Sequence, residues 1–196
     1  MTPRISPASP PDWSPEMTAF INNFRSGVVA HTPEENRQPG TNLLGTLARY
    51  PSLSMGFLTF NRHLLSTSAL SARQRELLVL RVAAIRQSDY EWAQHVILAE
   101  RAGIQADEIT RIVDGPDAPG WTVFERSLLK SVDELLADGV VSDETWTVLA
   151  AEFDDQQLMD VVFTVGCYSM LAMALRSFGV EPEAGLVPFL PKRLAE

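Results

Sequence analysis

The sequence predicts an all-α fold, a bundle of about seven to nine helices. Segments with apolar residues three and four positions apart follow one another along the 196 residues. Several of them open with Ser, Thr or Asp followed three positions later by Gln or Glu, which is the pattern of a helix capping box. No alternating apolar and polar run is long enough for a half-buried strand. The short connections favour antiparallel neighbours.

Residues 1–40 are expected to form a proline-rich N-terminal arm with one short helix. The first sixteen residues contain five prolines and no apolar core, so they do not have the pattern of a secretory signal. A helix can begin at Pro15, because proline fits a first turn, and Gly27 weakens its end. Residues 31–40 are typical of a polar loop. The apolar side chains of the helix are Phe20, Ile21 and Phe24.

The domain proper is expected over residues 41–180, followed by a C-terminal strap over 181–196. Two helices are predicted first, at 41–50 and 52–65, with Pro51 between them. The later helices are expected to begin at capping residues or just after them: Ser71, Ser88, Gln105, Thr122, Ser142 and Asp154. The last of them reaches about Phe178. The pairs Ser71–Gln74 and Ser88–Glu91 open the two helices of a hairpin whose turn falls near residues 87–88.

Charge and hydropathy exclude some classes of protein. The net charge is −9 and the pI is about 4.8, so a polyanion such as DNA is repelled and nucleic-acid binding is not expected. The apolar stretch 158–175 contains Asp160, Thr164, Tyr168 and Ser169, which favours a buried helix over a membrane span. We expect a cytoplasmic protein that does not bind membranes.

Metal, phosphate and thiol sites are not indicated. Cys167 is the only cysteine, so no disulfide or dithiol can form within the chain, and its apolar helix favours a buried, inert thiol. The three histidines have no metal-ligand spacing. No glycine-rich phosphate loop and no G-x-S-x-G motif occur. We therefore expect no metal and no cofactor.

The hairpin over residues 71–101 holds the residues that could do chemistry. Glu76, Arg81 and His95 interrupt otherwise apolar helices, and charged groups are rarely buried without a partner. In an antiparallel pair His95 is level with Arg81, and Glu76 lies one to two turns deeper. If both face inward, Glu76 and His95 can meet directly or through one water, which suits proton transfer. Arg81 could anchor an anionic group if it faces the same pocket.

Neighbouring residues are candidates for a substrate pocket, and each also has an ordinary structural explanation. Glu91 lies four residues before His95 on the same face, but a capping box with Ser88 explains it equally well. Tyr90 and Trp92 could form a wall or simply pack in the core. His63 could line a pocket or lie at the surface. Glu76 and His95 could themselves be a paired surface acid and a hydrogen-bonded core histidine.

The blocks RELLVLRVA, DYEWAQHV and AERAGI resemble the carboxymuconolactone decarboxylase/AhpD-like family, and the stretch from FERSLLK to MLAMAL is similar to the C-terminal half of its bacterial members. The resemblance covers roughly residues 40–180 and implies the AhpD-like helical bundle. In the peroxidase branch a glutamate is followed by Cys-x-x-Cys and a histidine, at positions matching Glu76, Ser88, Glu91 and His95. Both cysteines are absent here, and a thiolate is the obligatory nucleophile toward a peroxide. AhpD-like peroxide reduction is therefore disfavoured.

The decarboxylase branch uses no cysteine pair. The resemblance to it implies a cofactor-independent lyase that removes CO2 from a small unsaturated lactone or carboxylic acid, or a related enolising enzyme, with Glu76 and His95 as catalytic residues. Arg81, Tyr90, Glu91, Trp92 and His63 would bind the substrate. It also implies a homo-oligomer: dimer, trimer or hexamer. The alternative is a non-enzymatic, oligomeric binding protein with the same fold.

Overall fold

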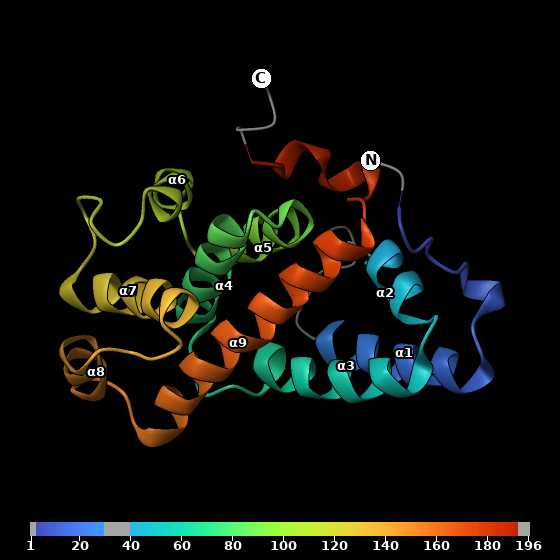
Figure 1. The fold of residues 1–196 in the computed structure, drawn as a ribbon, viewed down its shortest axis with the longest axis horizontal. Helices are drawn as coiled ribbons and strands as arrows, with labels where there is room; N and C mark the ends of the chain where they lie inside the picture. The colour runs from blue at the N-terminus through green and yellow to red at the C-terminus, as the bar shows by residue number, and fades with distance from the viewer. Residues whose placement is uncertain (1–2, 30–39, 192–196) are drawn as a thin grey trace.

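The structure is a computed structural model that describes residues 3–29 and 40–191. Residues 31–39 of the predicted polar loop lie outside these ranges. The described ranges contain nine α-helices, two short 3-10 helices and no strand, so the all-α prediction is confirmed (Figure 1). The elements are η1 (Pro10–Asp12), α1 (Pro15–Val29), α2 (Thr41–Leu47), α3 (Pro51–Ser66), α4 (Ala72–Arg86), α5 (Asp89–Arg101), α6 (Ala106–Asp114), α7 (Val123–Ala137), α8 (Asp143–Ala150), α9 (Asp155–Phe178) and η3 (Ala184–Phe189).

Local capping explains where several helices begin. In the predicted capping boxes of α4, α7 and α9, the N-cap side chain accepts a hydrogen bond from the N–H of the third helical residue. The side-chain oxygen of that third residue accepts one from the N-cap N–H. Gln105 and Glu108 form a further box at α6. Gly27 does not end the first helix, because α1 continues to Val29. The N-cap residues of the three predicted boxes are Ser71, Thr122 and Asp154.

Helix α4 is the centre of the bundle. Four consecutive residues, Leu77 to Leu80, are completely buried, which is possible only when a helix is covered on every side. The helices that cover it are α5, α6, α7 and α9 (Figure 1). Each buried leucine stabilises the fold by about 1.5–3 kcal/mol. A polar side chain in the middle of α4 therefore faces another helix rather than water.

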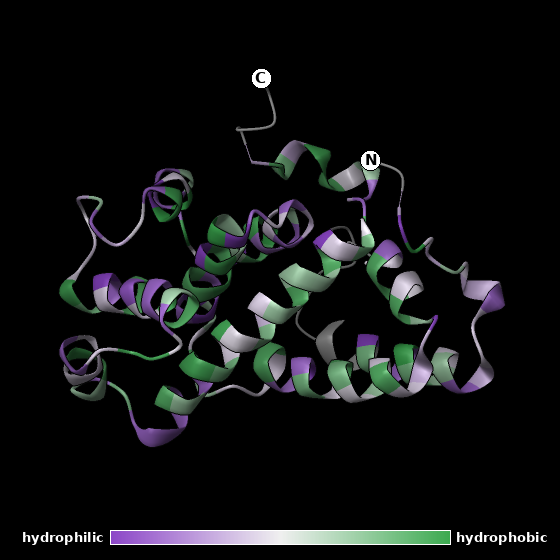
Figure 2. Ribbon diagram, in the orientation of Figure 1, coloured by the Kyte–Doolittle hydropathy of each residue, from purple (hydrophilic) through white to green (hydrophobic). Residues whose placement is uncertain are grey.

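Helix α9 crosses the bundle and is apolar over most of its 24 residues (Figure 2). By length and composition alone it could span a membrane, but 61% of its most apolar 18-residue window is buried in the fold. Asp160 on this helix accepts hydrogen bonds from Ser68 Oγ (2.9 Å) and the Ala69 N–H (2.6 Å). These contacts agree with a core helix. A cytoplasmic location stays a prediction.

The N-terminal segment packs on α2 and α3 around a second apolar cluster. Ala8 lies directly on the backbone of α2, and its N–H donates to the Gly45 carbonyl at 2.9 Å. A Cβ at Gly45 would lie 2.6 Å from the Ala8 carbonyl oxygen, so only glycine fits there. The Arg4 and Ile5 N–H groups both donate to the Phe178 carbonyl. The second cluster consists of Trp13, Met17, Ile21, Leu44 and Leu58.

The segment after α9 lies against α5. Its η3 helix buries Leu186 completely. Glu183 accepts hydrogen bonds from the Tyr90 hydroxyl (3.2 Å) and the Asn42 N–H (2.8 Å). The strap therefore joins α5 to α2.

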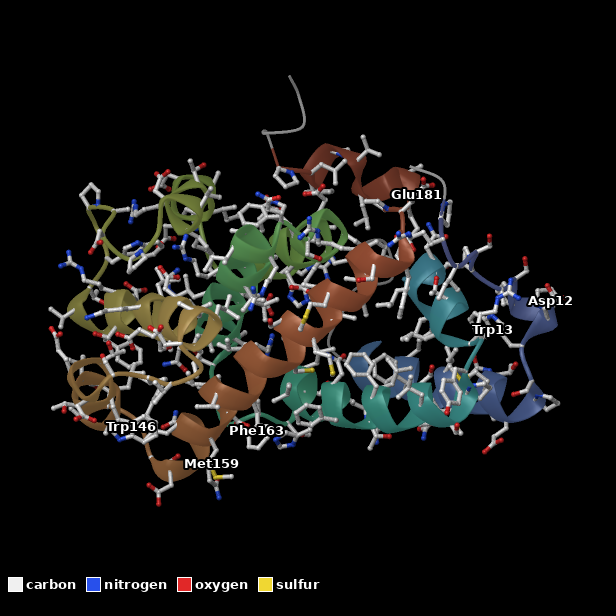
Figure 3. All side chains as sticks on the ribbon, in the orientation of Figure 1. Asp12, Trp13, Trp146, Met159, Phe163 and Glu181 are labelled. Carbon is white, nitrogen blue, oxygen red and sulfur yellow. The ribbon has the colours of Figure 1, made fainter. Side chains whose placement is uncertain are left out.

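Several large apolar side chains stay exposed on the single chain. Trp146, Met159 and Phe163 lie along one edge of the molecule (Figure 3). The exposed residues of α9 recur along the length of the helix: Met159, Val162, Phe163, Met170 and Met173. Such a row is typical of surfaces that a second protein covers. Homo-oligomer formation remains a prediction.

Arg81 ties α4 to two other helices. Its guanidinium binds the Asp133 carboxylate through Nε and Nη2, both at 2.7 Å, and Nη1 donates to the Ile112 and Val113 carbonyls at 2.9 Å. Gly115, with φ +102°, leaves room for it, because a Cβ there would lie 2.9 Å from Nη2. The sequence-based role of Arg81 as a substrate anchor depended on its facing the pocket. The structure places it instead between α4, α6 and α7.

We expect Arg81→Ala to lower the free energy of unfolding by about 2–3 kcal/mol, because it leaves Asp133 and two carbonyls without their donor. Urea denaturation measures this. Lys130→Ala on α7 removes an exposed ammonium whose two ion pairs are long, 3.8 Å and 3.3 Å, and should change the stability by less than about 1 kcal/mol. Equal effects of the two substitutions would contradict a structural role for Arg81.

Candidate active site

Glu76 and His95 meet inside the hairpin. His95 Nδ1 lies 2.6 Å from Glu76 Oε2. Glu76 is completely buried and His95 is 7% exposed. The turn between their helices lies at Gln87 and Ser88, as predicted, and Gln87 adopts a left-handed conformation there (φ 53°). The direct contact fixes the face that each helix presents to the other.

Arg75 completes the contacts of the Glu76 carboxylate. Its Nε donates to Oε1 at 2.9 Å, so each carboxylate oxygen has one charged or polar donor. Paired charges offset much of the cost of burying a carboxylate. Because Nδ1–H of His95 donates to Glu76, its Nε2 is left for another proton donor or acceptor. A histidine oriented by a carboxylate in this way can act as a general acid or base.

The prediction of a capping box formed by Ser88 and Glu91 is wrong. Ser88 is the N-cap of α5, but its side chain makes no capping hydrogen bond. The Glu91 side chain turns inward instead, and the residue is almost fully buried. Neither carboxyl oxygen of Glu91 has a hydrogen-bond partner among the residues that the structure describes. Burial raises the pKa of Glu91 well above its ordinary value, because desolvation favours the neutral carboxylic acid over the carboxylate.

Helix α9 contributes further polar atoms to this interior. The Tyr168 ring stands edge-on to the His95 ring, with centroids 4.9 Å apart. Burial raises the pKa of Tyr168, and the nearby carboxyls of Glu76 and Glu91 act in the same direction. Within the described ranges, the Tyr168 hydroxyl and the Thr164 hydroxyl one turn earlier have no partner. Unpaired buried polar groups cost about 1–3 kcal/mol each and often mark places for water or ligand.

Cys167 lies beside the same interior. It is 3% exposed, and the Asn61 amide points at its sulfur from α3 at 3.9 Å. Burial raises the pKa of the thiol to about 11, with Glu91 adding to the effect. The group is therefore a thiol and not a thiolate at neutral pH.

Most of the other predicted pocket residues lie apart from Glu76 and His95. Tyr90 is buried and donates to Glu183 on the strap, whose carboxylate adds to the effect of burial in raising the pKa of Tyr90. Trp92 is buried in the main core. His63 is half-exposed on α3, with Nε2 3.4 Å from Asp160. It lines a surface cavity of about 420 Å³ together with Phe60, Met159 and Phe163.

A larger cleft, of about 790 Å³, lies where the α4–α5 turn meets the end of α9. Ser88 and Tyr90 line it, but Glu76 and His95 line neither this cleft nor the cavity at His63. Among the described residues, no group of three or more His, Cys, Asp or Glu side chains could hold a metal ion.

The residues that sequence reasoning missed are Arg75, Thr164 and Tyr168. No sequence pattern points to Arg75. Adjacent helical residues normally face different directions, so an arginine directly before Glu76 is expected to be exposed. Thr164 and Tyr168 do leave a signal. They are polar residues four positions apart in an apolar helix, so they share one face of α9.

Comparison with known proteins agrees with this architecture. Residues 51–134 match the model of the carboxymuconolactone decarboxylase family. No curated protein sequence matches the chain. The alkylhydroperoxidase AhpD core of an uncharacterised peroxidase-related protein from Ralstonia eutropha JMP134 superposes with a TM-score of 0.76 at 16% identity, over 95% of each chain.

Two further crystal structures have the same fold. The debrominase Bmp8 has a TM-score of 0.73 at 12% identity, over 94% of this chain and 95% of its own. A protein of unknown function from Agrobacterium tumefaciens, described as a putative antioxidant defence protein AhpD, has a TM-score of 0.63 at 19% identity, over 69% of this chain and 94% of its own. At these identities the likeness establishes the fold alone.

We expect Cys167 to be unreactive in the folded chain, because its thiol is buried and mostly protonated. Ellman's reagent at pH 8 should label less than one tenth of the thiol within minutes, and all of it after unfolding in guanidinium. Rapid labelling of the folded chain would contradict the burial of Cys167.

We expect Glu91 to make stability depend on pH. Its raised folded pKa means that the folded chain holds a proton that the unfolded chain releases above its ordinary pKa of about 4.3. This contribution is complete below that value and is lost as pH rises toward the folded pKa. Glu91→Gln keeps a neutral side chain, so it should remove this loss and be the more stable form at pH 8.

Urea denaturation at pH 5 and pH 8 tests the role of Glu91. The difference between the two pH values should be smaller in Glu91→Gln than in the wild type. Glu144→Gln, at an exposed side chain, should leave the difference unchanged. The same pH dependence in all three proteins would show that Glu91 is ionised in the fold.

Proposed function

We propose that this chain, whose residues 51–134 match the carboxymuconolactone decarboxylase family, is a cofactor-independent enzyme that decarboxylates, or otherwise enolises, a small unsaturated lactone or carboxylic acid. The observation that carries this proposal is the buried contact between His95 Nδ1 and Glu76 Oε2 at 2.6 Å. It leaves an oriented imidazole with one free nitrogen in an apolar helical core. A histidine held in this way by a carboxylate can act as a general acid or base.

The reaction requires few groups. As the C–C bond to the carboxylate breaks, CO2 leaves and its bonding electrons move into the conjugated carbonyl, giving a dienolate. Hydrogen-bond donors stabilise the oxygen of this dienolate, and an acid returns a proton to carbon. In this proposal His95 Nε2 delivers that proton, while Glu76, itself bound by Arg75, orients the ring.

Glu91 can supply a second donor. A carboxylic acid kept neutral by burial donates a hydrogen bond to a developing enolate, which an ionised carboxylate cannot do. It lies four residues before His95 on α5, so both side chains project from the same face of the helix. Its unpartnered oxygens are consistent with this role.

The second candidate is a non-enzymatic binding protein. One observation favours it: Glu76 and His95 line neither of the two cavities described above, and His95 is only 7% exposed. In that case Arg75, Glu76 and His95 are a structural ion-pair cluster that fixes α4 against α5.

Peroxide reduction stays disfavoured, because Ser88 and Glu91 occupy the positions of the cysteine pair and Cys167 is a buried thiol.

We expect His95→Gln to reduce turnover at least about 100-fold, because general acid–base catalysis supplies about 10²–10⁴ of rate. The assay is a panel of unsaturated lactone carboxylates, followed by CO2 release and by deuterium uptake from D2O in NMR spectra. Circular dichroism should show unchanged helicity. Glu76→Gln should also lower turnover, because it removes the carboxylate that orients His95.

His63→Gln is the matched control, since His63 lies on α3 beside Asp160. It should retain the activity of the wild type. Turnover by His95→Gln at the rate of the wild type would remove His95 from the mechanism. No turnover or deuterium uptake by the wild type, together with a loss of stability in His95→Gln, would favour the structural alternative.

A further inference from the structure

The cleft of about 790 Å³ is formed by four parts of the chain: the α4–α5 turn, the last turns of α9, the N-terminal segment and the start of the strap. In Figure 1 the end of α9 lies beside the N-terminal segment, and Figure 3 places Glu181 at this point. Its wall carries both charged and apolar side chains. The apolar ones are Ala172, Met173, Leu175, Val180 and Pro182.

Three arginines from three different segments line this cleft: Arg4, Arg86 and Arg176. In the described part of the chain, their hydrogen bonds go to main-chain carbonyls and to a serine hydroxyl. Arg4 and Arg176 each donate to one carbonyl, those of Ser177 and Arg86. Arg86 donates to Ser169 Oγ at 3.0 Å and weakly to the Leu136 carbonyl. A guanidinium has five N–H donors, so each has donors left for a ligand.

This arrangement differs from that of the other arginines that face the bundle. Arg73, Arg75 and Arg81 each bind a carboxylate of the chain within 3 Å. The protein has 25 acidic and 16 basic residues, so acidic partners are abundant. Three neighbouring arginines that bind main-chain carbonyls or a hydroxyl instead are therefore typical of a site for an external anion.

The N-terminus of α5 opens onto the same cleft. Ser88, Asp89 and Tyr90 line it, and Ser88 does not cap the first turn of this 13-residue helix. Ser88 is 1% exposed, and its hydroxyl has no partner among residues 3–29 and 40–191. The first N–H groups of a helix and its dipole attract an anion. The buried hydroxyl is thus an independent sign of a ligand.

Two carboxylates also line the cleft, those of Asp89 and Glu181. Both have interaction partners of their own. The lining therefore carries three positive and two negative side chains, to which the helix N-terminus adds positive potential. An inorganic anion would use only the charges, whereas the apolar wall suits a ligand with a carbon skeleton.

We propose that this cleft binds the carboxylate of a small organic acid, with Arg86 and Arg176 as its anchors, Arg4 at the rim and the Ser88 hydroxyl and α5 N-terminus completing the site. Its identification as the anchor for the substrate rests on the function proposed above. Ser88 precedes Glu91 by one turn and His95 by two, which is about 10 Å along the helix axis. The cleft therefore lies at the end of the α5 face that carries Glu91 and His95, although neither of these side chains lines it.

Calorimetric titration with adipate, a flexible six-carbon dicarboxylate, tests the site without any turnover. Adipate should bind the wild-type chain, and adipamide, its neutral analogue, should not. Arg176→Gln should weaken adipate binding at least tenfold, and Arg4→Gln with Arg176→Gln should abolish it. Arg126→Gln on α7 is the matched control, because it removes an exposed arginine outside the cleft and should leave binding unchanged.

Three results would overturn the proposal: no binding of adipate by the wild type, equal binding by Arg176→Gln, or tighter binding of inorganic phosphate than of adipate. The acid–base function is tested separately by His95→Gln, which should bind adipate normally. With a turned-over substrate, Arg176→Gln should raise KM and His95→Gln should lower kcat. Arginine-dependent binding without any turnover would retain the anion site and remove the proposed reaction.

Discussion

The Glu76 carboxylate is the constraint on which the hairpin depends. It is completely buried, and its two oxygens accept hydrogen bonds from Arg75 and His95. Removing one partner of a buried ion pair costs about 3–5 kcal/mol, so α4 and α5 are held in the arrangement that supplies both donors. Because other helices surround α4, the acid–base pair is held by packing on all sides, which is how a proton-transfer group keeps its geometry.

Local patterns in the sequence predict the helices well, because capping depends on residues three positions apart. Ser71, Thr122 and Asp154 cap as expected. Ser88 and Glu91 have the same spacing and do not cap. The difference lies in the surroundings. The other boxes are exposed to water, whereas the start of α5 faces α9. The side chains of Ser88 and Glu91 are therefore buried in the interior, which no local sequence pattern reveals.

The contact between Glu76 and His95 could be predicted from the hairpin. The direction of the Arg81 side chain could not, because a position level with His95 along the helix axis does not say which way the side chain points. Arg81 lies five positions after Glu76, a rotation of about 140° around the helix axis, so the two side chains point to different neighbours. The partners of Arg81 come from α6 and α7, which are more than thirty positions away in the chain. Tyr168 and Asn61 likewise depend on how α9 and α3 pack, which is long-range information.

The contact between Ala8 and the backbone of α2 has a consequence for a distant part of the molecule. The chain is fixed at Gly45 through Ala8 and again at the Phe178 carbonyl through Arg4 and Ile5, with only two residues between these anchors. The path of this short span decides where the Arg4 guanidinium arrives. A side chain at position 45 would push the span outward and take one positive charge away from the rim. The charge of the cleft is therefore controlled in part by backbone contact at a glycine that no ligand touches.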